Sequence, residues 1–272
     1  MRAAMRMKIV LAVLTAALLG SSGAAWGYPG GTPGYQTDAA PFCASCHSSR
    51  SLEALAGVPG GRAQKELAEN KHLALIRAGE GDYAALEPAQ RQELALQIAA
   101  LDAASTVEID APDAVAPGST FKVSVAVTGG AGPVVGVGLV DADHRWHARP
   151  APSAGWFVVD APVITGQDFE DQVEWLSRRP EAAGRNLSYV NVAGISSDAS
   201  KKEWGQAKVV YTLRAPSVPG SYPLAAAFWY GTEKGSPLGY TTDPIRGKMV
   251  RGGFGGHSGR VLFTPVLRIK VE

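Results

Sequence analysis

The sequence predicts two parts of different fold class, a small all-α domain followed by an all-β antiparallel sandwich. Three observations indicate this. Apolar residues recur at helical spacing up to about Ser105, and after it they alternate with polar residues. Glycine and proline, 32 and 18 of the 272 residues, separate the alternating runs. The expected boundaries are residues 28–104 for the helical domain and 105–272 for the sandwich.

Residues 1–27 have the pattern of a secretory signal peptide. Basic residues lie at positions 2, 6 and 8, an apolar run of about eleven residues extends from Ile9 to Leu19, and small residues follow up to Gly27. The run is short for a membrane span, and no later segment approaches the roughly 18 apolar residues that a transmembrane helix needs. We therefore expect a periplasmic or secreted, cell-surface protein with no transmembrane segment after removal of the signal.

The pentapeptide Cys43-Ala44-Ser45-Cys46-His47 is a C-x-x-C-H motif, and its two cysteines are the only ones in the chain. This spacing is typical of covalent haem c attachment, with Cys43 and Cys46 forming the thioethers and His47 as the proximal iron ligand. A thioredoxin-like site would require a preceding strand, and a structural zinc site would require a second ligand pair. A bare disulfide would leave His47 unexplained. The motif therefore predicts one haem c.

Two helices are expected between the motif and the sandwich. Residues 62–78 contain strong helix formers and are followed by Gly79, which is typical of a helix C-terminus. Residues 88–103 begin with Pro88, and Leu94, Ile98 and Leu101 recur on one face. The short helical domain would obtain most of its core from a buried cofactor.

The signal peptide, the C-x-x-C-H motif and the closing helix that begins near Tyr83 together resemble a small monohaem class I cytochrome c over residues 35–104. The resemblance implies electron transfer to or from a redox partner protein or an extracellular electron acceptor. One feature departs from that family, because residues 78–83 lack the usual methionine ligand. We predict His72 as the distal ligand, since Leu75 and Ile76 share its helical face. The competing candidates are Lys71, Met249, His144, His257 and an open iron site.

The second half contains a series of short candidate strands. They lie at residues 106–110, 121–127, 134–140, 156–160, 187–192, 208–213, 223–229 and 261–271. Residues 168–179 have rough helical spacing and are expected to form a helix in an insertion. The stretches 116–125 and 213–224 resemble strand pairs of immunoglobulin-like and reeler-type domains, which implies a fold more than a function.

Other residues give weaker signals. His144 and His147 would point to opposite faces of a strand, so metal binding there is not expected. The glycine-rich stretch 252–259 lacks the strand and helix that flank a phosphate-binding loop. Basic and acidic residues nearly balance, at 26 against 25, which argues against nucleic-acid binding.

No catalytic constellation is recognisable, so the protein is not expected to be an enzyme. The first hypothesis is an exported electron-transfer protein that carries one haem and docks through its β-sandwich. The second is a ligand-binding or adhesion β-sandwich protein whose haem is a sensor or a structural staple.

Overall fold

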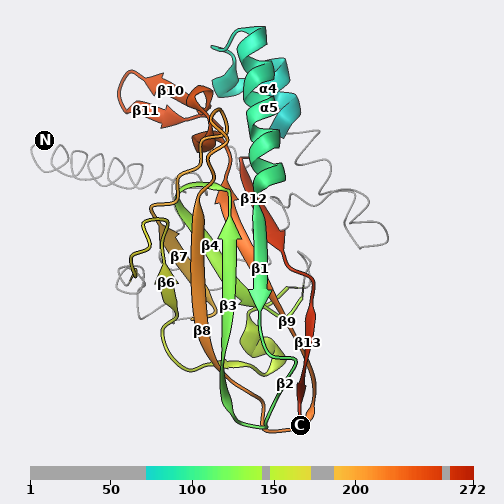
Figure 1. Cartoon of the computed structure of the whole chain (residues 1–272). Helices are drawn as coiled ribbons and strands as arrows, with labels where there is room; N and C mark the ends of the chain where they lie inside the picture. The colour runs from blue at the N-terminus through green and yellow to red at the C-terminus, as the bar shows by residue number, and fades with distance from the viewer. Residues whose placement is uncertain (1–71, 143–147, 173–186, 253–257) are drawn as a thin grey trace, which may run out of the picture.

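The computed structural model describes residues 72–142, 148–172, 187–252 and 258–272. These residues form an elongated β-sandwich with helices at one end (Figure 1). The helical elements are α4 (Ala74–Ala78), η3 (Gly81–Tyr83), α5 (Pro88–Ala104), η4 (Ala151–Ala154), η6 (Glu233–Gly235) and η7 (Pro237–Gly239). The strands are β1 (Thr106–Asp110), β2 (Ala114–Val115), β3 (Thr120–Thr128), β4 (Ala131–Val140), β5 (Phe157–Val158), β6 (Val163–Thr165), β7 (Tyr189–Ala193), β8 (Gln206–Arg214), β9 (Gly220–Gly231), β10 (Tyr240–Asp243), β11 (Gly247–Val250), β12 (Gly259–Phe263) and β13 (Leu267–Val271).

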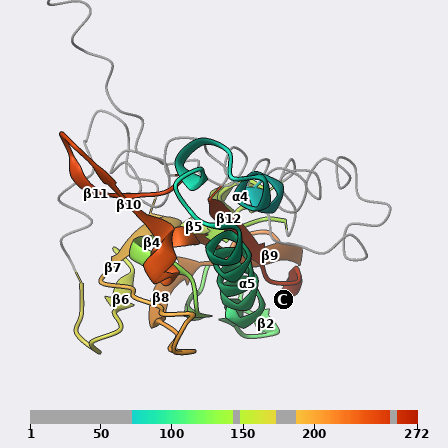
Figure 2. The ribbon, with the colours of Figure 1, turned by 90° about the horizontal axis from the view of Figure 1, so that it is seen from above.

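Two sheets build the sandwich. The first has the order β1-β3-β8-β5, with β6 also pairing with β8, and its pairs are antiparallel. The second has the order β2-β13-β9-β4-β7, with β12 also pairing with β9. Its β2–β13 pair is parallel. The hairpin β10–β11 stands apart from both sheets, at the same end as α4 and α5 (Figures 1 and 2).

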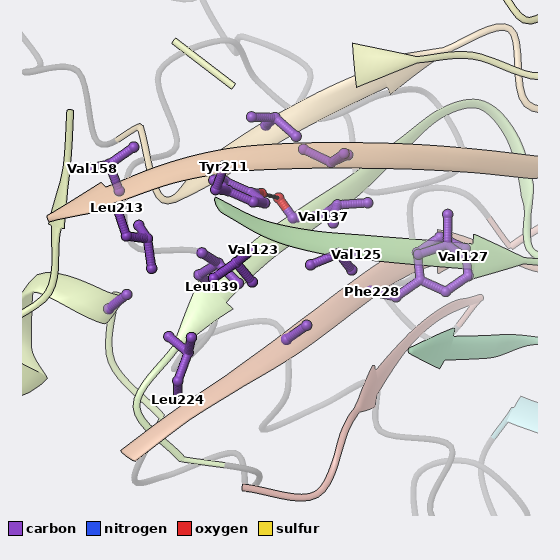
Figure 3. Packing of buried hydrophobic residues seen from close by; sticks show 14 of the residues in the cluster. Val123, Val125, Val127, Val137, Leu139, Val158, Tyr211, Leu213, Leu224 and Phe228 are labelled. Carbon is purple, nitrogen blue, oxygen red and sulfur yellow. Dashed lines mark hydrogen bonds between the residues drawn. The ribbon is translucent and has the colours of Figure 1, made fainter. Parts of the chain in front are cut away.

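The core lies between the two sheets. Alternate residues of β3 and β8 point inward and meet residues of β4 and β9, as Figure 3 shows for Val125, Leu213, Leu139 and Phe228. Tyr211 is fully buried there, and its hydroxyl donates to the Val137 carbonyl oxygen at 3.2 Å. Strand β9 is buried on both faces, because its other side chains pack with Tyr189 and Val261 in a second cluster. This explains why β9 is apolar almost throughout its second half.

Helices α4 and α5 pack on each other and on the end of the sandwich (Figure 2). Ile76, Leu94 and Ile98 form a buried cluster that Leu238 from the β half also contacts. Gly79 ends α4 with φ 73°, the left-handed conformation that glycine adopts easily. At the start of α5, Pro88 occupies the first turn and the Gln90 side chain accepts the Glu87 backbone N–H at 2.9 Å.

A single residue, Ser105, joins α5 to β1. Its hydroxyl donates to the Leu101 carbonyl oxygen at 2.7 Å and accepts the backbone N–H of Gly130 at 2.9 Å. Gly129 must lack a side chain, because a Cβ there would lie 2.7 Å from the Ser105 Cα. The end of the helix is therefore tied to the loop between β3 and β4.

The predicted fold class is wrong for the part of the helical half that the structure describes. Residues 72–104 contribute two α-helices, and these pack against the sandwich rather than forming a separate all-α haem domain. The physical reason is that the apolar faces of α4 and α5 bury each other and Leu238, so they need no porphyrin to fill their core. Residues 28–71 lie outside the described residues, and the domain boundary at 104 stays a prediction.

The helix expected over 168–179 is also wrong for residues 168–172. That stretch forms a turn, in which Phe169 has φ 64° and Thr165 and Asp171 make a β-bridge. The amide of Gln172 explains the difference, because it exchanges hydrogen bonds with the backbone of Ala193 at 2.9 and 2.8 Å. Tertiary contacts thus replace the local helical preference.

Candidate functional site

The predicted site residues fall in two groups. Cys43, Cys46 and His47 lie outside the described residues, so their assignment as haem attachment site and proximal ligand stays a prediction. His72 is described and is 1% exposed. Its burial agrees with the helical face that predicted it and excludes a surface histidine.

His72 lies in a buried polar network at the junction of the helices and the sandwich. The network, as we use the term, consists of His72, Tyr83, Asp102, Tyr230, Thr232, Glu233 and Arg260. Its members come from the segment just before α4, from η3, from the last turn of α5, from β9 and the residue after it, from η6 and from β12. Elements that are far apart in the sequence are thereby joined by side-chain hydrogen bonds.

The His72 ring bridges an anion and a cation. Its Nδ1 lies 2.9 Å from Arg260 Nη2, and its Nε2 lies 2.5 Å from Glu233 Oε1. A guanidinium group can only donate hydrogen bonds, so Nδ1 must accept. The ring proton then lies on Nε2 and is donated to Glu233. Both edges of the imidazole are occupied by protein side chains.

Glu233 is fully buried and accepts hydrogen bonds at both carboxylate oxygens. Tyr83 Oη donates to Oε1 at 2.7 Å, and Thr232 Oγ1 lies 2.6 Å from Oε2. Burial raises the pKa of Glu233, but the contact with His72 and the hydrogen bonds from Thr232 and Tyr83 more than offset this and lower its pKa below its ordinary value. Burial and the neighbouring Glu233 raise the pKa of Tyr83, which stays a phenol and a donor.

Arg260 connects the network to α5. Its Nε donates to Asp102 Oδ2 at 3.0 Å, and the hydroxyl of Tyr230 donates to Asp102 Oδ1, also at 3.0 Å. Tyr230 is the cross-strand partner of Arg260 in the β9–β12 pair. Burial lowers the pKa of Arg260, but Asp102 and Glu233 outweigh it and raise the pKa. The guanidinium is therefore charged and paired.

The chemistry of this network is structural. His72 and Glu233 are buried and hydrogen-bonded on every side that the structure describes, and Asp102, whose side chain is 22% exposed, is paired with Arg260 and Tyr230. These contacts hold the elements together and present no general acid, base or nucleophile to a substrate cavity among the described residues. The described residues also contain no group of three or more His, Cys, Asp or Glu side chains that could hold a metal ion.

Met249, a competing candidate for the distal iron ligand, lies on β11 and is half-buried. Lys71, His144, His147 and His257 lie outside the described residues. Of the candidate distal ligands, the described part of the chain therefore includes only His72 and Met249, and Met249 is not a member of the network around His72.

Sequence reasoning missed Glu233, Arg260, Asp102 and Tyr83. A usable signal existed for two of them. Glu233 closely follows the apolar run 224–230, and Arg260 precedes the apolar residues 261–263 within a strand pattern. A charged residue at the end of a fully buried strand needs a partner, and this pairing requirement could have drawn attention to both.

A second feature is an exposed apolar row on the outer face of the first sheet. The row consists of Phe157, Val159 and Val163, which are 51%, 37% and 51% exposed. Their neighbours Val158 and Ile164 are buried, as the alternation of a strand requires. The row lies along β5 and β6, which both pair with β8.

Cations border this row. The Arg214 guanidinium carbon lies 4.6 Å from the centre of the Phe157 ring, and Arg214 is the cross-strand partner of Phe157. Lys208 and Lys122 are exposed on the same face, because Lys208 pairs with Thr165 and Lys122 pairs with Thr212 of β8. The outer face therefore combines apolar side chains with positive charge.

Comparison with known proteins does not assign the chain to a family. No protein-family model matches the chain, and no curated protein matches it. A solved structure that matches is the CARDB domain of the PF1109 protein from Pyrococcus furiosus in complex with di-metal ions. It is 12% identical, and the match covers 62% of this chain and 87% of that chain with a TM-score of 0.22. At that score the likeness carries no argument about fold or function.

The resemblances drawn from the sequence are corrected accordingly. The described residues are mostly β, and the helices of residues 72–104 bury their apolar faces within the protein, so a class I cytochrome c domain is not supported. No family model supports the immunoglobulin- or reeler-type likeness either. Electron transfer, which the cytochrome resemblance implied, loses its basis. Within the described part of the chain, no helix is long and apolar enough to cross a membrane.

Proposed function

We propose that the protein is an exported, non-catalytic β-sandwich binding protein that docks a partner protein on the outer face of its first sheet. The observation that carries this proposal is the apolar row of Phe157, Val159 and Val163 with its cationic border. Three neighbouring apolar side chains on one sheet face contribute nothing to the core while they stay exposed to water. Burial against a partner would recover roughly 25 cal/mol for each Å² of apolar surface covered.

The charge around the row defines the chemistry of the partner. Arg214, Lys208 and Lys122 would be left beside the contact, so the complementary surface is apolar at its centre and acidic at its rim. Rim charges act mainly on the association rate and are screened by salt. The complex should therefore weaken as ionic strength rises.

The proposal includes one haem c, which Cys43 and Cys46 would bind covalently and His47 would ligate. Two thiols and one imidazole at this spacing are the donor set that haem c requires. Once attached, haem supplies an iron centre and a large apolar surface. In this protein we propose that it serves as a structural staple or as a sensor.

Site-specific photo-cross-linking in the cells that produce the protein tests the docking face. A photoreactive phenylalanine is placed at Phe157 or at Val163, and the control position is Leu96, a 58% exposed apolar residue on α5. We expect one discrete cross-linked protein from the first two positions and none from Leu96. Substitution of Arg214 by glutamate should abolish that product.

Equal labelling at all three positions, or a product that persists in the Arg214→Glu variant, would show that this face is not a specific docking surface. A pyridine haemochrome spectrum of the purified protein tests the haem separately, because it reports covalent haem whether or not the partner is known.

A further inference from the structure

We infer that His72 is a positioning residue whose imidazole is held by Arg260 and Glu233, and that it does not ligate the iron of the haem at Cys43–His47. The inference rests on the proposed haem and makes its coordination more specific, because it removes His72 from the residues that would hold the iron. It reverses the role that the sequence alone suggested for His72.

The first reason for this inference is that both ring nitrogens of His72 are already engaged. A neutral imidazole has one nitrogen lone pair in the ring plane, and in His72 this lone pair is on Nδ1. It accepts from Arg260 Nη2 at 2.9 Å. The other nitrogen carries its proton toward Glu233 Oε1 at 2.5 Å. No lone pair is left for a metal ion.

The second reason is that the ring is buried among charged partners that an iron atom would have to displace. His72 is 1% exposed, and Tyr83 Oη lies 3.5 Å from Nε2 on the side that Glu233 also occupies. An iron–nitrogen bond would have to replace either the guanidinium or the carboxylate. The displaced group would then stay buried without its partner, which is strongly unfavourable for a charge.

The position of His72 in the chain indicates which structural role its contacts have. His72 lies just before α4 and follows the C-x-x-C-H motif in the sequence. Its two bonds reach Glu233 in η6, which follows β9, and Arg260 in β12, and β9 and β12 both belong to the second sheet. The ring therefore fixes the point at which the chain from the motif arrives at the sandwich.

The test uses the full-length protein as purified, with His72→Ala, His72→Gln and Glu233→Gln variants. The spin state of the ferric iron is read by electron paramagnetic resonance, the ferrous protein is mixed with carbon monoxide, and the urea midpoint is measured. We expect all three variants to keep the spin state and the carbon monoxide rate within about twofold of the parent protein. His72→Ala should lower the urea midpoint, and His72→Gln should recover part of it, because an amide both donates and accepts.

Conversion of a low-spin iron to high spin in both His72 variants, reversed by added imidazole, would overturn the inference. Nitrogen-15 NMR of the His72 ring gives a second readout that needs no haem. We expect an unprotonated Nδ1 and a protonated Nε2, and the opposite tautomer would overturn the inference. Absence of haem from the parent protein would instead refute the cofactor part of the proposed function, and the NMR result would still decide the role of His72.

Discussion

Removal of the Asp102 carboxylate should destabilise the protein by about 3 kcal/mol. Asp102 accepts one charge-assisted hydrogen bond, from Arg260, and one neutral hydrogen bond, from Tyr230. Bonds of these kinds contribute about 1.5–3 and about 1 kcal/mol respectively. Asp102→Ala would also leave the buried Arg260 without its carboxylate partner on α5. Because the Asp102 side chain is 22% exposed, water can reach the gap and limit the loss.

The measurement is urea unfolding, followed in parallel by circular dichroism and tryptophan fluorescence, with the free energy obtained by linear extrapolation. Asp102→Asn retains an oxygen that can accept from Tyr230 but removes the charge, so its loss should be intermediate. Asp160→Ala removes an exposed aspartate just after β5 and should leave the free energy of unfolding unchanged within error.

The three variants should also fall in a definite order of stability. Asp102→Ala should be the least stable variant, Asp102→Asn the next, and Asp160→Ala equal to the parent protein. A loss below about 0.5 kcal/mol for Asp102→Ala would refute the reasoning, because surface substitutions commonly have effects of that size. It would mean that α5 does not depend on the network for its attachment to the sandwich.

The core, one glycine contact and one turn aspartate each allow a further test. Leu213→Ala should cost about 2–5 kcal/mol of unfolding free energy, since Leu213 is fully buried, whereas Ile245→Ala at a 93% exposed position should cost little; similar losses for both would contradict the described core. Gly252→Ala should be more destabilising by thermal melting than Gly247→Ala, because both have positive φ but only the first would place a Cβ against Tyr83 Oη; equal melting temperatures would argue against that contact. The backbone amides of Arg246 and Ile245 donate to the Asp243 carboxylate and lower its pKa. The stability that these hydrogen bonds add to the β10–β11 turn is therefore fully present above the ordinary pKa of about 3.9. It is lost as the pH falls through the lower pKa of the folded state. A carbon-13 titration that places the pKa of Asp243 at or above its ordinary value would count against this.

The period-two pattern located the strands because each strand of the first sheet has one buried and one solvent-facing side. The expected strand at 106–110 is β1, and the runs around 121–127 and 208–213 are the centres of β3 and β8. Val123, Val125 and Val127 are buried while Lys122 and Ala126 are exposed. The helix from Pro88 was predictable for the same kind of reason, since Leu94, Ile98 and Leu101 are its buried face.

The periodicity did not predict which part of the protein packs against those buried faces. The same stripe of leucine and isoleucine could cover a porphyrin or another helix, and the structure places Leu238 from the β half against it. His72 illustrates the limit most sharply. Its spacing indicated an inward orientation, which the structure shows. Its partners Glu233 and Arg260, however, lie 161 and 188 residues away, and no local pattern reports contacts of that range.

The single-residue connection at Ser105 has a consequence for how the protein unfolds. The hydroxyl of Ser105, the residue directly before β1, is hydrogen-bonded both to the last turn of α5 and to the β3–β4 loop. Unfolding of the C-terminal turn of α5 should therefore also disturb β1, the edge strand of the first sheet. Amide hydrogens of α5 and β1 should exchange as one cooperative unit, with similar free energies of opening.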